Sequence, residues 1–310
     1  MKNSAVYVFD ELCTAIRNYI KSQYFSKNQF LLNAINQELE NEGVLFKKPY
    51  IESSPAYQST ENGFFKSSKL DPWLKSLLVN LAESNIGVQK SPYIHQLQAL
   101  ESFLEDKDVF VSTGTGSGKS LSFFIPIVNE IIKNRANNYG KTSAIIIYPM
   151  NALANSQLEE IKKFLRGYDD GTKPFTVGQY TGQESEEQRQ YLADNPPDIL
   201  LTNFMMMELL LTRGTPKDRP VMKNCDGLQF LVLDELHTYR GRQGADVALL
   251  VRRLRQKTRS PNLVCIGTSA TMSNQGDAAD QNAVVAQVAS KLFGTDISAN
   301  NVIGETLSQS

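Results

Sequence analysis

A glycine-rich loop between an apolar strand and a helix constrains the fold of this chain more than any other feature. The segment "DVFVS" (108–112) is followed by "TGTGSGKS" (113–120) and then by the apolar "LSFFIPIVNEII" (121–132). The three glycines let backbone N–H groups turn inward, and the start of the helix adds its positive end to the same place. A loop in this context predicts a phosphate-binding site, and a turn that merely joins a strand to a helix is disfavoured by its Gly-Lys-Ser ending.

The residues of this loop suit a nucleoside triphosphate bound together with magnesium. Lys119 would reach the β- and γ-phosphates, and the Ser120 hydroxyl would ligate Mg²⁺. The strict pattern has glycine where this chain has Thr113, and Pro126 should kink or loosen the helix that follows. The residues expected to hold ATP here are Thr115, Gly116, Ser117, Gly118, Lys119 and Ser120.

A second apolar run ends in two carboxylates. The segment "LQFLVLDELHTYRGRQG" (228–244) brings Asp234 and Glu235 to the end of a predicted strand. An Asp in that position of a phosphate-loop enzyme holds Mg²⁺, usually through water. Asp234 is therefore the expected metal residue, and Glu235 is placed to orient or deprotonate the water that attacks the γ-phosphate. A solvated Asp-Glu pair in a loop is the alternative, which the phosphate loop makes weaker.

The order of elements predicts an α/β fold with a parallel sheet. From about residue 93, β-rich runs alternate with amphipathic stretches, so helices should cover both faces of the sheet. Ligands of such sheets bind at the carboxyl ends of the strands. Residues 1–90 have helical spacing instead and are predicted to form a mainly helical extension, with residues 91–310 as the nucleotide-binding domain. The predicted strands are 108–112, 143–148, 175–180, 198–202, 230–234 and 263–267.

Composition narrows the class of protein. The chain has 310 residues, is 41% hydrophobic and 21% charged, and has a formal net charge of −1, so a nucleic-acid contact must come from a local face. Its three cysteines, Cys13, Cys225 and Cys265, form no CxxC pair, which fits a reducing compartment. No signal peptide and no apolar run of membrane-spanning length is visible, so we expect a cytoplasmic protein without a membrane partner.

The motifs together resemble those of superfamily-two DExH-box helicases. The phosphate loop, "DELH" (234–237) and "TSAT" (268–271) stand in the order of that family, over roughly residues 93–275. The resemblance implies a RecA-like lobe that hydrolyses ATP with Mg²⁺. It further implies that Gln96 in "YIHQLQA" reads the adenine, and that His237, Ser269 and Thr271 couple the nucleotide to the nucleic acid. His95 beside Gln96 is also consistent with a local hydrogen bond alone.

Three further segments are similar to the family's strand-binding motifs. These are "YPMNALANSQ" (148–157), "YTG" (180–182) and "LLTNFMMMELLL" (200–211). Taken singly, "YTG" could be a simple turn and the methionine-rich segment an ordinary buried helix. In the order found here, the resemblance implies contacts to nucleic-acid phosphates through Asn151, Thr181, Gly182, Thr202 and Asn203. In the basic stretch 240–259, Arg240 is expected to bond phosphate or a neighbouring lobe. The remaining basic residues are expected to form a solvated face.

The segment "HTYRGRQGADVALLVRRL" (237–254) is similar to helicases related to Lhr and MrfA, which include bacterial DNA-repair and phage-defence proteins of the Druantia or DISARM type. Leu236 departs from the alanine usual in that group. The resemblance implies an ATP-dependent DNA helicase or translocase, DNA being favoured over RNA, with a defence-system partner conceivable. The alternatives are an RNA helicase and an NTPase that moves on nucleic acid without unwinding it. The family's second RecA-like lobe and its arginine finger do not fit in the forty residues after "TSAT", so we expect them beyond this chain and expect residues 1–310 to hydrolyse ATP poorly.

Overall fold

The protein forms two compact units, Met1–Ser54 and Pro55–Ser310. The computed structural model describes residues 4–25, 28–41, 43–47, 55–61, 63, 69–105, 108–114, 116–138, 140–166, 168, 172–239, 241–270 and 278–308. Three predicted site residues, Thr115, Arg240 and Thr271, lie outside these ranges. The boundary between the two compact units lies at 54/55, and the segment from residue 70 to 88, which belongs to the predicted extension 1–90, buries its leucines in the core of the second unit.

The first unit is helical, as its spacing predicts. It contains α1 (Ala5–Ile20), a short π-helix (Lys21–Phe25) and α2 (Gln29–Glu40). Ser4 and Asn28 cap the two α-helices through their side-chain oxygens, which satisfy backbone N–H groups of the first turns. Within this unit Arg17 Nε donates to the Leu39 carbonyl oxygen over 3.1 Å, so the two helices are tied together.

The second unit contains a seven-stranded parallel sheet of order β3-β4-β2-β5-β6-β1-β7. The prediction of a parallel sheet is confirmed, and each of the six predicted strands is present. The seventh, β7, was not predicted, since three residues give too short a pattern. The strands are β1 (Val109–Ser112), β2 (Ala144–Tyr148), β3 (Val177–Tyr180), β4 (Ile199–Asn203), β5 (Phe230–Leu233), β6 (Val264–Ser269) and β7 (Val302–Gly304).

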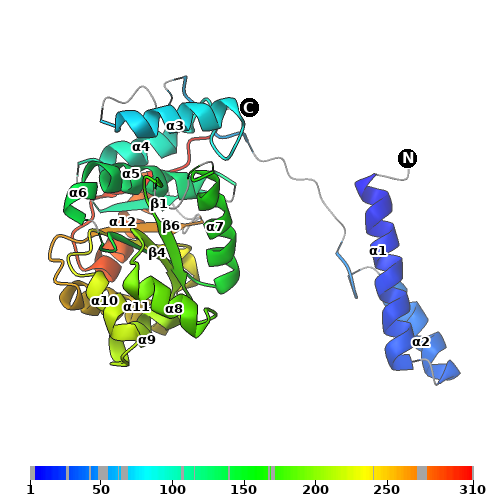
Figure 1. The fold of residues 1–310 in the computed structure, drawn as a ribbon. Helices are drawn as coiled ribbons and strands as arrows, with labels where there is room; N and C mark the ends of the chain where they lie inside the picture. Colours follow the sequence, from blue (N-terminus) through cyan, green and yellow to red (C-terminus); the bar gives the residue numbers. More distant parts are fainter. Residues whose placement is uncertain are drawn as a thin grey trace. The chain divides into compact units, whose positions relative to one another are not determined.

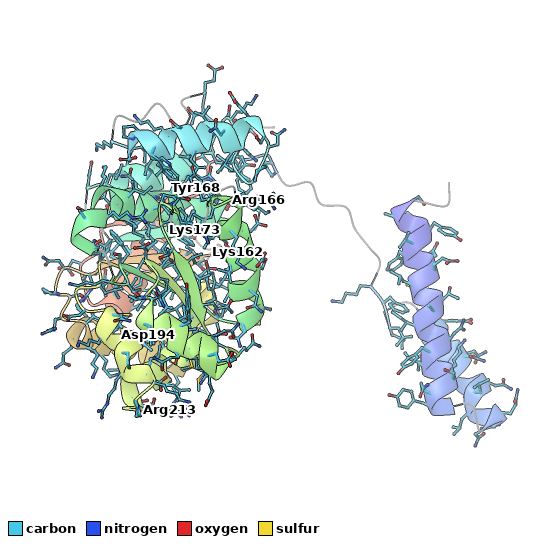
Figure 2. All side chains as sticks on the ribbon, in the orientation of Figure 1. Lys162, Arg166, Tyr168, Lys173, Asp194 and Arg213 are labelled. Atoms are coloured by element: carbon cyan, nitrogen blue, oxygen red, sulfur yellow. The ribbon has the colours of Figure 1, made fainter. Side chains whose placement is uncertain are left out.

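Helices cover both faces of the sheet (Figure 1). Alternate residues of β2 show the division: Ile146 packs in one buried cluster with α3, α4, α5 and α7, whereas Ile145 and Ile147 pack in the other with α9 to α12. Side chains fill the space between the layers (Figure 2). The helices of this unit are α3 (Pro72–Glu83), α4 (Ile94–Phe103), α5 (Lys119–Lys133), α6 (Arg135–Asn138), α7 (Asn151–Lys163), α8 (Glu186–Asp194), α9 (Phe204–Thr212), α10 (Asp218–Asn224), α11 (Arg242–Lys257) and α12 (Ala278–Phe293), with 3₁₀ turns at Leu236–Thr238 and Ala299–Asn301.

Two local predictions concern the start of α3 and the proline within α5. Asp71 caps α3 and Pro72 stands at its first position, as predicted, because proline lacks the N–H that the first turn leaves unpaired. Helix α5 runs through Pro126 without ending there. In the described part of the chain, no helix combines the length and the apolar character needed to cross a bilayer.

Candidate nucleotide site at the carboxyl edge of the sheet

The loop between β1 and α5 closes on itself around Thr113. The Thr113 hydroxyl shares a 2.6 Å hydrogen bond with that of Ser117, and the Thr113 carbonyl accepts from Lys119 Nζ over 3.0 Å. Gly116 and Gly118 have φ values of +78° and +69°, which glycine adopts without the cost that a side chain would impose. Threonine in place of the pattern's first glycine is thus a structural member of the loop, fully buried beneath it.

Helix α4 supports the loop from behind. Gln96 Nε2 donates to the Gly118 carbonyl over 3.0 Å, and His95 Nε2 lies 2.8 Å from the Ser117 carbonyl. A Cβ atom at position 118 would lie 2.4 Å from Gln96 Nε2 and would displace that amide, while the positive φ of Gly118 favours glycine on its own. Burial lowers the pKa of His95, which favours the neutral ring. His95 therefore makes the local hydrogen bond that the sequence left open.

The acidic pair meets the phosphate loop at one edge of the sheet. Strand β6 separates β5 from β1, and Thr268 at its end donates a hydrogen bond to Asp234 and accepts the Glu235 N–H over 3.2 Å. Lys119 Nζ lies 3.7 Å from Glu235 Oε1. Burial is the main cause that raises the pKa of Asp234, with the Glu235 charge adding to it and the Thr268 hydrogen bond and Lys119 opposing it. Lys119 and Asp234 therefore lie at the same edge of the sheet.

Glu235 is held in an unusual backbone conformation. Its φ and ψ of 52° and 49° lie in the left-handed region, which costs a residue with a side chain about 1 kcal/mol or more. The buried Oε2 atom has no hydrogen-bond donor among the described residues. A carboxylate on a strained backbone next to a lysine suits a group that takes a proton from a bound water.

His237 connects the acidic pair to the end of β6. Its Nδ1 lies 3.3 Å from both Ser269 Oγ and the Ala270 nitrogen, and 3.1 Å from Glu235 Oε2. The Ala270 N–H can only donate, so Nδ1 uses its lone pair there and cannot also donate a proton to Glu235. A ring with a proton on Nδ1 would lose the hydrogen bond from Ala270 and donate to Glu235 instead. The predicted coupling residues His237 and Ser269 are therefore in contact.

This arrangement agrees with the comparisons with known proteins. The family model of DEAD/DEAH box helicases matches residues 93–278, more than half of the chain. The chain belongs to the DEAD/DEAH box helicase family. Its relatives include Druantia protein DruE of Escherichia coli strain UMEA 4076-1, 27% identical over 84% of this chain and 20% of the relative, and the uncharacterized ATP-dependent helicase YprA of Bacillus subtilis strain 168, 31% identical over 66% of this chain and 26% of the relative.

Solved helicase structures show the same fold. The DUF1998 helicase MrfA bound to DNA and AMPPNP matches with a TM-score of 0.60 and 25% identity, over 87% of this chain and 33% of that one. The same helicase in another crystal structure matches with a TM-score of 0.58 and 27% identity, over 77% of this chain and 33% of that one. This chain spans about a fifth to a third of the length of these relatives. The resemblance to helicases of the Lhr, MrfA and Druantia type is confirmed.

The helicase site suits magnesium that is held partly by the nucleotide. No group of three or more His, Cys, Asp or Glu side chains that could hold a metal gathers anywhere in the described ranges. Mg²⁺ keeps several waters and is held in nucleotide sites by one or two protein oxygens plus phosphate oxygens. Asp234 lies beside the start of α5, where Ser120 follows Lys119. Asp234 and Ser120 can therefore supply the one or two protein oxygens that such a magnesium site needs.

The predicted strand-binding residues of this helicase form one connected turn region. Asn203 Nδ2 donates to Asn151 Oδ1 over 2.6 Å and to the Thr181 carbonyl over 3.1 Å, so the ends of β3, β4 and the start of α7 are joined. The predicted contact of Thr202 with nucleic acid does not fit this structure, because its side chain is fully buried and its hydroxyl donates to the Tyr180 carbonyl over 2.6 Å. The hydroxyl supports β3 and does not reach the surface.

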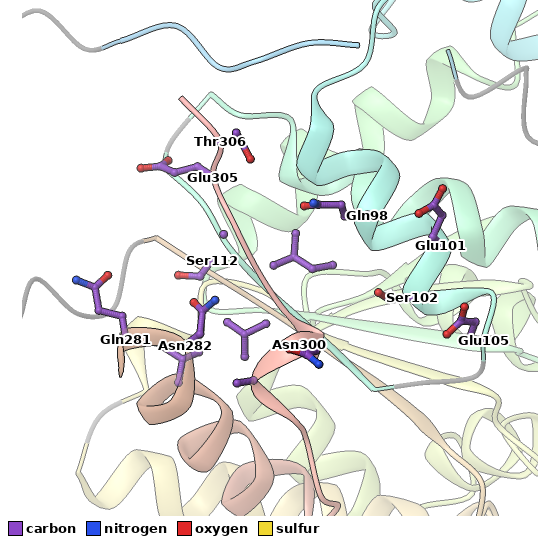
Figure 3. Close-up of a pocket in the computed structure, with 15 residues that line it drawn as sticks. Gln98, Glu101, Ser102, Glu105, Ser112, Gln281, Asn282, Asn300, Glu305 and Thr306 are labelled. Atoms are coloured by element: carbon purple, nitrogen blue, oxygen red, sulfur yellow. The ribbon is translucent and has the colours of Figure 1, made fainter. Parts of the chain in front are cut away.

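Two residues that the sequence did not single out lie against the phosphate loop. Glu305, directly after β7, accepts the Gly114 N–H at Oε2 over 2.8 Å, and a Cβ at position 114 would lie 2.6 Å from the Tyr57 hydroxyl. Glu305 also lines a cavity of about 630 Å³ between α4 and the start of α12 (Figure 3). Glu305 carries no motif, because β7 reaches the loop only through tertiary packing, and no local pattern assigns Tyr57 a place against the phosphate loop.

Proposed function

We propose that residues 91–310, within the second unit, carry the ATP-hydrolysing machinery of a DNA helicase or translocase, and that residues 1–90 supply no chemistry of their own. The observation that carries this proposal is the meeting of Lys119, Asp234 and Glu235 at one sheet edge. Lys119 and the backbone around Gly116 and Gly118 would hold the phosphates. Magnesium bound there would offset the charge that builds up as the γ-phosphate leaves.

The roles of the chain's own groups follow from their contacts. Asp234 and Ser120 would hold the metal, and Glu235, beside Lys119, would orient and deprotonate the attacking water. Gln96 has its Oε1 engaged by the Tyr93 N–H over 3.0 Å, so an adenine contact would use the remaining hydrogen of Nε2. His237 would transmit the state of the nucleotide to Ser269 at the end of β6.

The substrate and the setting are part of the same proposal. The MrfA structure in complex with DNA supports DNA as the polymer, and the similarity to Druantia protein DruE supports a role in a phage-defence system. A partner protein from such a system is part of the proposal. Binding should be directed to the nucleic-acid backbone and sensitive to salt, since no base-reading element is visible. A reducing, cytoplasmic setting suits the free thiols of Cys13, Cys225 and Cys265.

The phosphate-loop lysine gives the direct test. Lys119→Ala should abolish ATP-dependent activity and leave the fold intact, with Lys162→Ala on the exposed face of α7 as the matched control. Single-turnover hydrolysis should be slow for residues 1–310, because the second lobe and its arginine are expected elsewhere. Retained hydrolysis in Lys119→Ala would refute the site, and brisk DNA-stimulated hydrolysis by the unaltered chain would refute the need for a second lobe.

The two alternatives separate in further assays. An RNA helicase would show stimulation by oligo-rU rather than oligo-dT. A translocase that does not unwind would displace a bound protein from a duplex but would not separate the strands, when the complete protein is used. Stimulation by oligo-dT together with strand separation would support the DNA helicase.

A further inference from the structure

The turn after β3 already holds an anion. The Glu184 carboxylate accepts the Thr181 N–H at 2.9 Å from each oxygen, the Gly182 N–H over 2.8 Å, and the Thr181 hydroxyl over 2.8 Å. Three donors from two neighbouring residues thus converge on one negative charge. Hydrogen bonds to a charged acceptor are stronger than those between neutral groups, so the turn is a specific anion-binding site. We call this site, formed by the Thr181 N–H, the Thr181 hydroxyl and the Gly182 N–H, the seat.

The backbone makes this turn a site for an oxyanion in general. Gly182 has a φ of +92°, a conformation that turns successive N–H groups to the same side and forms a concavity for anions. Arg189 on α8 holds the other face of the turn, since its guanidinium donates to the Gly182 carbonyl over 3.0 Å and lies over the Tyr180 ring. The seat therefore has support that does not depend on Glu184.

The same donors are those predicted to bind nucleic-acid phosphate, Thr181 and Gly182, so this inference rests on the proposed function. A carboxylate resembles a phosphate in offering two oxygens and negative charge to the same donors. Gly182 is exposed, so a strand can approach the turn from solvent. Both anions cannot occupy it together, because like charges at contact distance repel.

We propose that Glu184 occupies the seat of a strand phosphate and must leave when nucleic acid binds. The carboxylate is then an internal competitor, and apparent affinity falls by the fraction of molecules in which the seat is open. Each binding step also carries the repulsion between the displaced carboxylate and the strand. Such a competitor weakens binding and speeds release, which suits a lobe that must let go of the strand in each cycle.

The test compares two single-charge changes on the same turn and helix. Glu184→Gln removes the charge from the seat, and Glu187→Gln removes an equal charge from the exposed first turn of α8. Fluorescence anisotropy with labelled oligo-dT over a series of salt concentrations gives the dissociation constant and its salt dependence for the whole chain. Melting temperature checks the fold of each variant.

We expect Glu184→Gln to bind about five-fold more tightly, because the internal competitor is removed. The slope of log K against log salt should change little, because the strand phosphate occupies the seat in both bound forms and the seat contributes no cation. Glu187→Gln should change affinity by less than about two-fold and leave the slope unchanged. Thr181→Val, which deletes a donor that both anions use, should weaken binding in either background.

Several results would overturn the proposal. If Glu184→Gln binds no more tightly than the unaltered chain, Glu184 only stabilises the turn. The same conclusion follows if neither Glu184→Gln nor Glu184→Ala folds. An equal gain in Glu187→Gln would assign the effect to general charge. If neither the unaltered chain nor any variant binds oligo-dT at low salt, nucleic-acid binding itself is refuted, whereas normal binding that ignores Glu184 refutes this inference alone.

Discussion

Lys119 Nζ and Glu235 Oε1 lie 3.7 Å apart, although β1, which precedes the loop that carries Lys119, and β5, which precedes Glu235, are separated by β6 in the sheet. Lysine from the start of α5 crosses the end of β6 to reach the carboxylate after β5. Thr268, near the end of β6, hydrogen-bonds both members of the acidic pair. The site is therefore built at the carboxyl ends of three neighbouring strands, β5, β6 and β1.

Glu235→Gln should separate binding of the nucleotide from its hydrolysis. The amide keeps the size of the side chain but cannot take a proton, so the rate of hydrolysis should fall at least about a hundred-fold. Affinity for ATP should change little, since Lys119 and the loop backbone remain. Fluorescent-nucleotide titration and single-turnover hydrolysis measure the two. An equal loss in both would mean that Glu235 acts by holding the loop in shape.

Thr268→Val should weaken both the fold and the reaction. It removes the hydroxyl that donates to Asp234 and accepts from the Glu235 N–H, leaving buried groups unsatisfied at a cost of about 1–3 kcal/mol. Thr268→Ser keeps the hydroxyl and serves as the matched control. Urea unfolding and ATP hydrolysis of the two variants measure the effect. A serine variant as impaired as the valine variant would assign the effect to the lost methyl group instead.

Asp234→Asn should make the nucleotide-free protein more stable while it abolishes magnesium-dependent hydrolysis. Burial raises the pKa of Asp234, so its ionised form costs stability at neutral pH. That cost shrinks as the pH falls through the raised pKa, and it vanishes below the ordinary Asp pKa of about 4. The melting temperature should therefore exceed that of the unaltered chain at pH 7, with the gain disappearing toward pH 4.

Asp226→Asn provides the control of opposite sign for that experiment. The hydrogen bond from Arg259 holds the pKa of Asp226 below its usual value, so its carboxylate contributes stability at neutral pH. This variant should show no gain in melting temperature at pH 7. A gain in both variants would point to the overall charge of the chain rather than to the burial of Asp234.

Glu305→Gln should weaken nucleotide binding without slowing the chemical step. The Glu305 carboxylate holds the Gly114 N–H, and its charge-assisted hydrogen bond fixes the start of the phosphate loop. We expect a rise in KM of about three-fold to ten-fold at unchanged kcat. Glu101→Gln, which lines the same cavity from α4 (Figure 3), is the control. A fall in kcat alone would place Glu305 in the chemistry instead.

The sequence by itself determined the class of fold and the chemical core of the site. Six strands and the loop-to-helix start at Lys119 follow from local patterns, because strand composition and glycine spacing act over a few neighbouring residues. Asp234 and Glu235 were readable for the same reason. The order of motifs then placed the chain in its family.

Only the tertiary structure decided how those pieces meet. Glu305 joins the site through the pairing of β1 with β7, and pairing between distant segments leaves no local signal. The "TSAT" motif includes Thr268, but its two hydrogen bonds to the acidic pair depend on the pairing of β5 with β6. Thr202 lost its predicted surface contact because the β3–β4 pairing buries its hydroxyl. Glu184 acquired its place on the Thr181–Gly182 turn through a left-handed glycine, which fixes where N–H groups point only once the chain is folded.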